Sequence, residues 1–206
     1  MTGLRERKKA ETRAALGWAA IHLAVERGYD NVRVEDIAEA AGVSPRTFNN
    51  YFSSKAEAIA SRHLDRSRRT AAALRERPTD EPLWTALTEA ALQQFTRGPE
   101  VEAMPTFPHA QWTAGLRAML DEPALQGERL RAVAMAEAEL AAAVAERTGT
   151  SLASDMYPRL VAAAATAAVT VATQHYLDSG DPPIPIEHLI TDAFAQIAAG
   201  LPAPPR

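Results

Sequence analysis

A short polar segment, residues 45–52, carries the side chains best suited to a chemical task. If it is helical, at about 100° per residue, Phe48 and Phe52 share one side and Tyr51 lies at its edge. Arginine can pair with guanine, and asparagine with adenine, through two hydrogen bonds each, while threonine can contact a phosphate or a thymine methyl. The spacing therefore predicts a helix that contacts base edges in a major groove. Its outward residues are Arg46, Thr47, Asn49 and Asn50.

Two further residues would extend this face to the DNA backbone. Tyr51 at its edge and Lys55 at the start of the next helix suit phosphate contacts, and the helix N-terminus would assist the lysine. A second interpretation stays open, because an ordinary polar helix face in an all-α bundle has the same pattern.

The elements that must position this face have clear local signals. Ser44 is a strong N-cap, because its hydroxyl can accept a hydrogen bond from an unpaired amide. Pro45 fits the first helical position, which needs no amide hydrogen. A shorter helix is predicted over residues 34–41, Gly42 ends it, and the apolar Val43 anchors the turn. Two short helices joined in this way form a helix-turn-helix.

Helical patterns account for most of the remaining chain. The 44 alanines among 206 residues favour helix, since alanine loses no side-chain entropy there. Gly28 ends the first pattern, and Gly17 within it costs about 1 kcal/mol relative to alanine, which indicates close packing. No alternating strand pattern is found, so an all-α fold is predicted. The helical patterns cover residues 5–27, 54–74, 83–97, 106–120, 123–148, 152–179 and 186–200.

Charge is divided unevenly along the chain. The net charge of −4 would by itself argue against a nucleic-acid partner. Residues 1–75 hold 14 Lys and Arg against 9 Asp and Glu, a net +5, whereas residues 76–206 hold 8 against 17, a net −9. A nucleic-acid-binding module joined to a different domain would show this asymmetry. A fluctuation of surface charge is the alternative.

The sequence offers no catalytic or metal-binding pattern. Cysteine is absent, which excludes disulfides, thiolate zinc sites and thiol nucleophiles. GxSxG, P-loop, GxGxxG and HExxH motifs are missing, and the histidines lack metal-ligand spacing. We therefore expect neither an enzyme nor a cofactor. The apolar run 160–173 is too short to cross ~30 Å of hydrocarbon, and the charged start is no signal peptide, so a cytoplasmic protein without a membrane partner is expected.

Residues 28–59, GYDNVRVEDIAEAAGVSPRTFNNYFSSKAEAI, carry a family signature. Their VxDIAxxAGVS and TFxxYFxSK blocks resemble the DNA-binding region of TetR/AcrR-type transcriptional regulators. Members often have threonine where this chain has Arg33, which removes an N-cap acceptor worth ~1 kcal/mol or adds a phosphate contact. The resemblance implies a ligand-responsive repressor that binds a palindromic operator as a homodimer. It assigns the DNA contacts to Arg46, Thr47, Asn49, Asn50, Tyr51 and Lys55.

The resemblance also implies a domain organisation. A three-helix helix-turn-helix domain would cover residues 1–53, a connecting helix 54–75, and a helical ligand-binding and dimerisation domain 76–206. Ligand binding would favour a conformer in which the connecting helix moves the two recognition helices apart. The basic start of the chain either reaches the DNA backbone or minor groove or is a solvated helix start. Its cations are Arg5, Arg7, Lys8 and Lys9.

The C-terminal part suggests a dimer interface and an effector site. Small residues over 160–173 indicate a helix that is buried on all sides, and the last helix has a wide apolar face. The last two helices of each subunit would then form a four-helix interface, with an intramolecular core as the alternative. An apolar or acyl-type effector suits aromatic and methionine side chains, each of which could instead be plain core. The candidates are Trp84, Phe95, Met104, Phe107, Trp112, Leu116, Met119 and Met135, with His175 as a polar contact.

A function from another class also stays open. A helical small-molecule-binding protein or enzyme could retain a helix-turn-helix that no longer binds DNA. The acidic C-terminal part favours this alternative, whereas the intact polar face near residue 50 opposes it. Binding to operator DNA discriminates between the two.

Overall fold

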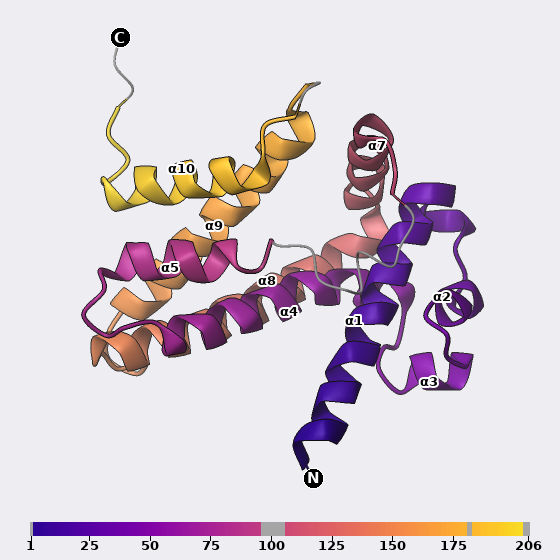
Figure 1. Ribbon diagram of the computed structural model, residues 1–206, viewed down its shortest axis with the longest axis horizontal. Coiled ribbons are helices and arrows are strands. Elements are labelled where there is room, and N and C mark those ends of the chain that lie inside the picture. Colours follow the sequence, from indigo (N-terminus) through magenta and orange to yellow (C-terminus); the bar gives the residue numbers. More distant parts are fainter. Residues whose placement is uncertain (1, 96–105, 181–182, 204–206) are drawn as a thin grey trace. The chain divides into compact units, whose positions relative to one another are not determined.

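The protein is all-helical over the residues that the computed structural model describes, 2–95, 106–180 and 183–203 (Figure 1). No strand occurs in these ranges, which confirms the all-α prediction. In chain order the elements are α1 (Thr2–Arg27), the 3-10 turn η1 (Tyr29–Asn31), α2 (Val34–Ala40), α3 (Pro45–Asn49), α4 (Lys55–Glu76), α5 (Leu83–Leu92), α7 (His109–Leu120), α8 (Pro123–Thr148), α9 (Tyr157–Asp178) and α10 (Ile186–Ala198).

Several boundaries differ from the sequence-based expectation: α1 begins earlier, at Thr2, α5 ends at Leu92 and is followed by a turn, and α7 begins at His109. Two further differences lie at α3 and α9. α3 ends at Asn49, and the residues up to Phe52 form a turn. α9 begins at Tyr157, because the residues before it form a turn in which the Asp155 carboxylate accepts the Ser151 amide at 2.7 Å. Local side-chain hydrogen bonds of this kind compete with helix.

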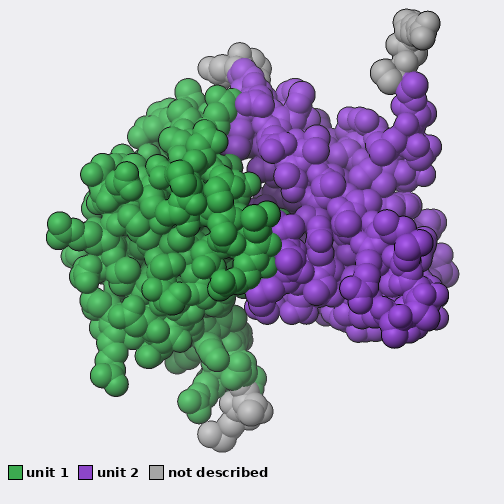
Figure 2. All heavy atoms as spheres, turned by 180° about the vertical axis from the view of Figure 1, so that it is seen from behind, with its two compact units in different colours: residues 1–65, 97–132 green, residues 66–96, 133–206 purple. Residues whose placement is uncertain are grey.

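Packing divides the chain into two compact units, which Figure 2 colours separately. Unit 1 comprises residues 1–65 and 97–132, and unit 2 comprises residues 66–96 and 133–206. α4 and α8 each contribute residues to both units. The domain limits predicted at residues 53 and 75 rest on sequence pattern and stay a prediction.

The core of unit 1 forms around one face of α1. Leu16 of this face is fully buried in one cluster with Ile37 of α2 and Phe48 of α3. Gly17 lies where α1 crosses α4, and a Cβ at this position would lie 3.2 Å from the carbonyl oxygen of Ala58. The close packing that this glycine indicated is therefore the approach of two helix backbones.

α7 also packs in unit 1. A Cβ on Gly115 would lie 2.7 Å from Cγ1 of Val25, so α7 and α1 touch closely here. Phe107, just before α7, has its ring centroid 4.5 Å from that of His22 and 6.1 Å from that of Trp112. These aromatic side chains thus pack against the core of unit 1.

Unit 2 is packed largely from small side chains. Ala90 of α5, Ala143 of α8 and Ala162 of α9 are all fully buried. Phe194 of α10 is buried too, and its ring meets that of Trp84 edge to face, with 6.2 Å between centroids. Alanine at these positions lets the helices approach closely, which explains how an alanine-rich sequence fills this core.

α9 is buried on one side only. Val161 and Ala172 are buried, whereas Leu160 is 60% exposed and Val171 is 59% exposed. The expectation that this helix is buried on all sides is therefore not met within one chain. The described helix α9 is long and apolar enough to cross a membrane, but core helices of soluble proteins meet the same two criteria.

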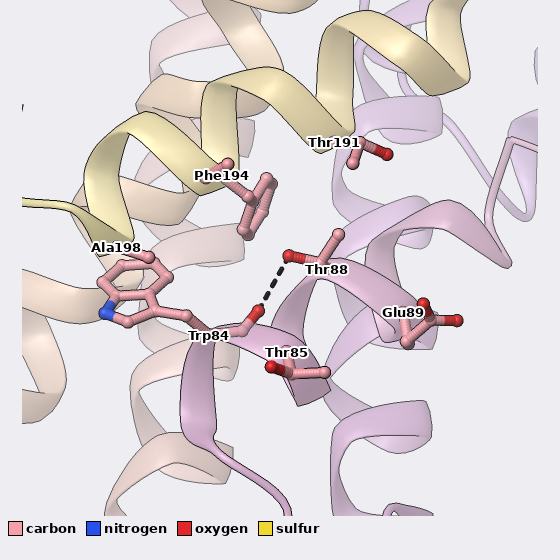
Figure 3. Close-up of a pocket in the computed structure, with 8 residues that line it drawn as sticks. Trp84, Thr85, Thr88, Glu89, Thr191, Phe194 and Ala198 are labelled. Carbon is pink, nitrogen blue, oxygen red and sulfur yellow. Dashed lines mark hydrogen bonds between the residues drawn. The ribbon is translucent and has the colours of Figure 1, made fainter.

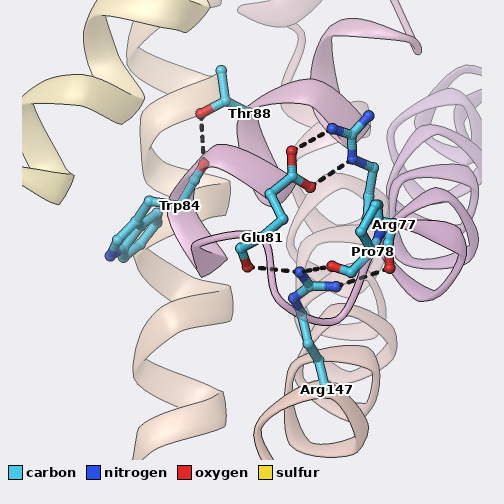
Figure 4. A network of polar contacts seen from close by, with 6 residues as sticks. All are labelled: Arg77, Pro78, Glu81, Trp84, Thr88 and Arg147. Carbon is cyan, nitrogen blue, oxygen red and sulfur yellow. Dashed lines mark hydrogen bonds and ion pairs between the residues drawn. The ribbon is translucent and has the colours of Figure 1, made fainter.

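A network of polar contacts holds the connection between α4 and α5 (Figure 4). Arg147 of α8 donates to the carbonyls of Arg77 at 3.2 Å, Pro78 at 2.5 Å and Glu81 at 2.8 Å. Arg77 and Glu81 form an ion pair, and the hydrogen bond from Arg77 lowers the pKa of the Glu81 carboxyl. The network fixes the point at which α5 begins.

Candidate nucleic-acid interface

The start of α3 is set by two signals that the sequence contains. The Ser44 hydroxyl oxygen accepts a hydrogen bond from the Thr47 amide at 3.1 Å, and it lies 2.9 Å from the Thr47 hydroxyl. Pro45 occupies the first turn of the helix. The N-cap and the proline position are thus confirmed, and the cap also orients the Thr47 side chain.

The two sides of α3 differ as the angular pattern predicts. Phe48 and Phe52 are 0% and 1% exposed, with ring centroids 5.7 Å apart. The polar set lies on the solvent side: Arg46, Asn49 and Asn50 are exposed, and Thr47 is half-buried. The structure therefore leaves this face open to a partner, while its contacts with DNA stay a prediction.

Arg13 of α1, which sequence analysis missed, links the end of α3 to α4. Its Nη1 donates to the Tyr51 carbonyl at 3.4 Å, and its Nε lies 3.4 Å from Oδ1 of Asp65. Its guanidinium also lies 4.5 Å from the centre of the Phe52 ring. Tyr51 and Asp65 are 38 and 52 residues away along the chain, so no local pattern could mark Arg13.

Lys55, predicted to contact a phosphate, makes internal contacts with the η1 segment. Its Nζ donates to the carbonyls of Tyr29 at 2.6 Å and Val32 at 3.0 Å, and lies 4.0 Å from the centre of the Tyr29 ring. Burial raises the pKa of the Tyr29 hydroxyl. Because an ammonium group has three donors, two are used inside the protein and one is left for a phosphate.

The helices that flank α3 are capped by carboxylates. Arg33 offers no acceptor, but the Asp36 carboxylate accepts a hydrogen bond from the Arg33 amide at 2.8 Å. At α4, the Glu57 carboxylate accepts the Ser53 amide at 2.7 Å, and the Ser54 hydroxyl accepts the Glu57 amide at 3.0 Å. Asp36 therefore supplies one half of a capping box, the half that does not depend on the side chain at position 33, and the Arg33 side chain is exposed.

Half of the described residues considered for an effector site lie in unit 1. Met119 is buried there, and Phe107, Trp112 and Leu116 pack against the same cluster. Met104 falls outside the described residues. The side chains near α7 thus belong to a packed core in this structure.

The other candidates lie in unit 2. The Phe95 ring packs under the Arg66 guanidinium at 4.2 Å, whereas Met135 is 43% exposed and His175 is exposed. The described residues contain no cluster of His, Asp and Glu fit for a metal ion.

A groove of about 230 Å³ lies between α5 and α10 (Figure 3). Trp84 and Phe194 supply its aromatic walls, and Thr88 and Thr191 line it with hydroxyl-bearing side chains. Both hydroxyls donate to carbonyls of their own helices, Thr88 to that of Trp84 at 2.7 Å. Of the residues considered from sequence, only Trp84 lines this groove.

Comparison with known proteins assigns both parts of the chain. Residues 18–60 match the model described as bacterial regulatory proteins, tetR family, and residues 81–202 match the MftR C-terminal domain. The HTH-type transcriptional regulator TcmR of Streptomyces glaucescens is 34% identical over 176 residues, which make up 84% of this chain and 76% of that protein.

Solved structures share the fold over almost the whole chain. A TetR-family transcriptional regulator from Rhodococcus sp. is 26% identical with a TM-score of 0.56, over 93% of this chain and 99% of that one. The fatty acid degradation regulator FadR from Bacillus halodurans has a TM-score of 0.55 at 16% identity, over 94% and 97%, a likeness of fold alone. With both domain models and the relative in agreement, the chain belongs to the TetR family of bacterial DNA-binding transcriptional regulators, which are not enzymes.

Proposed function

We propose that this regulator is a repressor that binds a palindromic operator as a homodimer and releases it when a small molecule binds. The observation that carries the DNA part is the exposed polar face of α3, opposite the buried Phe48 and Phe52. A regulator of chromosomal genes in a bacterium acts in the cytoplasm.

The recognition helix α3 would lie in the major groove. In this proposal Arg46, Asn49 and Asn50 contact base edges, because their side chains are exposed and can form paired hydrogen bonds with guanine or adenine. Thr47, Tyr51 and Lys55 would contact phosphates. Two of the three donors of Lys55 bind the carbonyls of Tyr29 and Val32, so one donor is left for a phosphate. The same ammonium group would then contact both the η1 segment and the DNA backbone.

The homodimer would form through the last two helices, α9 and α10. In support of this, α9 exposes an apolar row at helical spacing: Tyr157, Leu160, Ala167 and Val171. Contiguous exposed apolar surface of this kind commonly marks a protein interface. A second copy of α9 would cover the row and complete the burial that the small residues of this helix predict.

The effector would be an apolar or acyl-type small molecule bound in the part of the chain that matches the MftR C-terminal domain. The side chains proposed for it in unit 2 are Phe95, Met135 and His175. Phe107, Trp112, Leu116 and Met119 would take part only in a conformer in which α7 rearranges, since they are packed in this one. Binding would shift the population toward a conformer whose recognition helices no longer match the operator.

A gel shift with the promoter adjoining the regulator's own gene tests the DNA proposal. The wild type should form a complex that weakens steeply with salt, and Arg46→Ala should weaken it by about 1–3 kcal/mol and relax one base position. Arg131→Ala is a matched control, because this α8 side chain is 72% exposed and pairs with Glu128. If no salt-sensitive complex forms with any neighbouring promoter, the helix-turn-helix is vestigial.

A further inference from the structure

The first turns of α1 project beyond the core of unit 1. Residues 3–11 are all exposed, and full burial begins at Leu16. In Figure 1 this part of α1 extends past α3. We call residues 3–11 the projecting segment. Because Arg13 bonds to the Tyr51 carbonyl, the projecting segment begins directly beside the end of the recognition helix.

Three cations of the projecting segment lie on one face of α1. At about 100° per residue, Lys8, Arg5 and Lys9 fall within an arc of about 100°. Leu16 and Leu23 fall within the same arc and are buried in the core of unit 1. The face of α1 that packs onto the helix-turn-helix thus continues as a cationic face where the core ends.

Arg7 differs from these three in both position and pairing. It lies about 160° from Arg5 around the helix, and its Nε is 3.5 Å from the Glu11 carboxylate. In the part of the chain that the structure describes, no carboxylate pairs with Arg5, Lys8 or Lys9. Their charges are therefore available to an anionic partner, whereas that of Arg7 is partly neutralised.

We propose that Arg5, Lys8 and Lys9 bind phosphates of the DNA strand that borders the major groove occupied by α3. At 1.5 Å per residue, Arg5 lies about 12 Å along the axis from Arg13, close to the ~12 Å width of a major groove. The segment is therefore long enough to reach from the end of α3 to a backbone that borders the groove. The inference rests on the proposed docking of α3, and it adds a sequence-independent contact to it.

Salt dependence of binding tests this assignment. The triple variant R5Q/K8Q/K9Q removes the three charges, and glutamine keeps a helix propensity close to that of lysine and arginine. The control R7Q removes one charge from the other side of the same helix. The dissociation constant of each full-length protein is measured by fluorescence anisotropy between 50 and 200 mM salt. Two duplexes are used, the promoter and a scrambled sequence of equal length and composition.

The triple variant should show a shallower slope of log affinity against log salt, by about 0.9 for each lost contact in a subunit. With three contacts in each subunit of the proposed homodimer, the slope changes by about 5.4, and the wild type loses about 2,000-fold more affinity across this fourfold salt range than the variant does. The effect should be equal on both duplexes, and R7Q should keep the wild-type slope.

Two results would overturn the assignment. One is a wild-type slope in the triple variant, with helix content unchanged by circular dichroism. The other is a loss confined to the promoter duplex, which would show that the contact depends on base sequence and is not a contact with phosphates alone. Failure of the proposed function looks different, since the wild type would then form no salt-sensitive complex in the first place.

Discussion

Replacing Arg13 by methionine should weaken both the fold of unit 1 and the binding of operator DNA. Methionine keeps an unbranched apolar stem but removes the guanidinium. With it go the pair to Asp65, the bond to the Tyr51 carbonyl and the cation at the Phe52 ring. Because Tyr51 and Phe52 follow directly after α3, the substitution should also loosen the position of the recognition helix.

The size of the effect follows from burial and distance. The side chains of Arg13 and Asp65 are 26% and 15% exposed, between an exposed pair worth 0–1 kcal/mol and a buried pair that costs about 3–5 kcal/mol to break. A cation near an aromatic face adds about 0.5–1 kcal/mol. The bond to Tyr51 is long at 3.4 Å and adds little. We expect Arg13→Met to lower the free energy of unfolding by about 2 kcal/mol.

A double-mutant cycle with Asp65→Asn isolates the ion pair, because it cancels effects that each substitution has alone. Urea unfolding is followed by tryptophan fluorescence in a Trp84→Phe background, so that the two remaining tryptophans, Trp18 and Trp112, both lie in unit 1. A coupling energy of about 1 kcal/mol is expected. Coupling below about 0.3 kcal/mol, or unchanged operator affinity in folded Arg13→Met, would refute the reasoning.

Three further predictions concern the packing of helices, the proposed dimer and one ion pair. Gly127→Ala in α8, where a Cβ meets nothing within 4 Å, should stabilise the protein by up to about 1 kcal/mol. The free energy of unfolding of Gly17→Ala should lie about 1–3 kcal/mol below that of Gly127→Ala, because the new Cβ crowds α4. Equal free energies of unfolding in urea titrations of the two variants would contradict the close crossing of α1 and α4. If the proposed dimer forms through α9, light scattering should show a dimer for the wild type and a monomer for Leu160→Glu with Val171→Glu, whereas Leu130→Glu, at a 71% exposed α8 position, should scatter like the wild type. The hydrogen bond from Arg75 lowers the pKa of Glu146 below its ordinary 4.5. The ion pair therefore contributes to stability above pH 4.5, and this contribution is lost as the pH falls through the lowered pKa. Glu146→Gln should make the free energy of unfolding depend less on pH in this acid range.

Local patterns in the sequence were enough to predict the recognition helix. The Ser44 cap, the proline after it and the burial of Phe48 and Phe52 all depend on residues within one or two turns, and the structure confirms each of them. The internal contacts of Lys55 could not be predicted in this way, because they depend on the path of η1 more than 20 residues earlier.

Residue type alone does not distinguish a ligand site from a packed core. Phe107 and Phe95 were selected because aromatic rings suit apolar ligands, but rings suit packed cores equally well. The structure places Phe107 against His22 in unit 1 and Phe95 under Arg66 in unit 2. Only a contact map distinguishes these uses, and no spacing rule in the sequence encodes the relevant contacts.

The packing of α7 bears on how a signal from an effector can reach the DNA-binding helices. The match to the MftR C-terminal domain begins at residue 81 and includes α7, yet α7 packs in unit 1 through Gly115 against Val25 and through Phe107 against His22. Closely packed interiors transmit displacements, because they leave no room for one element to move alone. Any movement of α7 must therefore displace side chains of α1, the helix whose Leu16 packs with Phe48 of α3. In the proposed function, an effector that displaces α7 would therefore act on the recognition helix through α1.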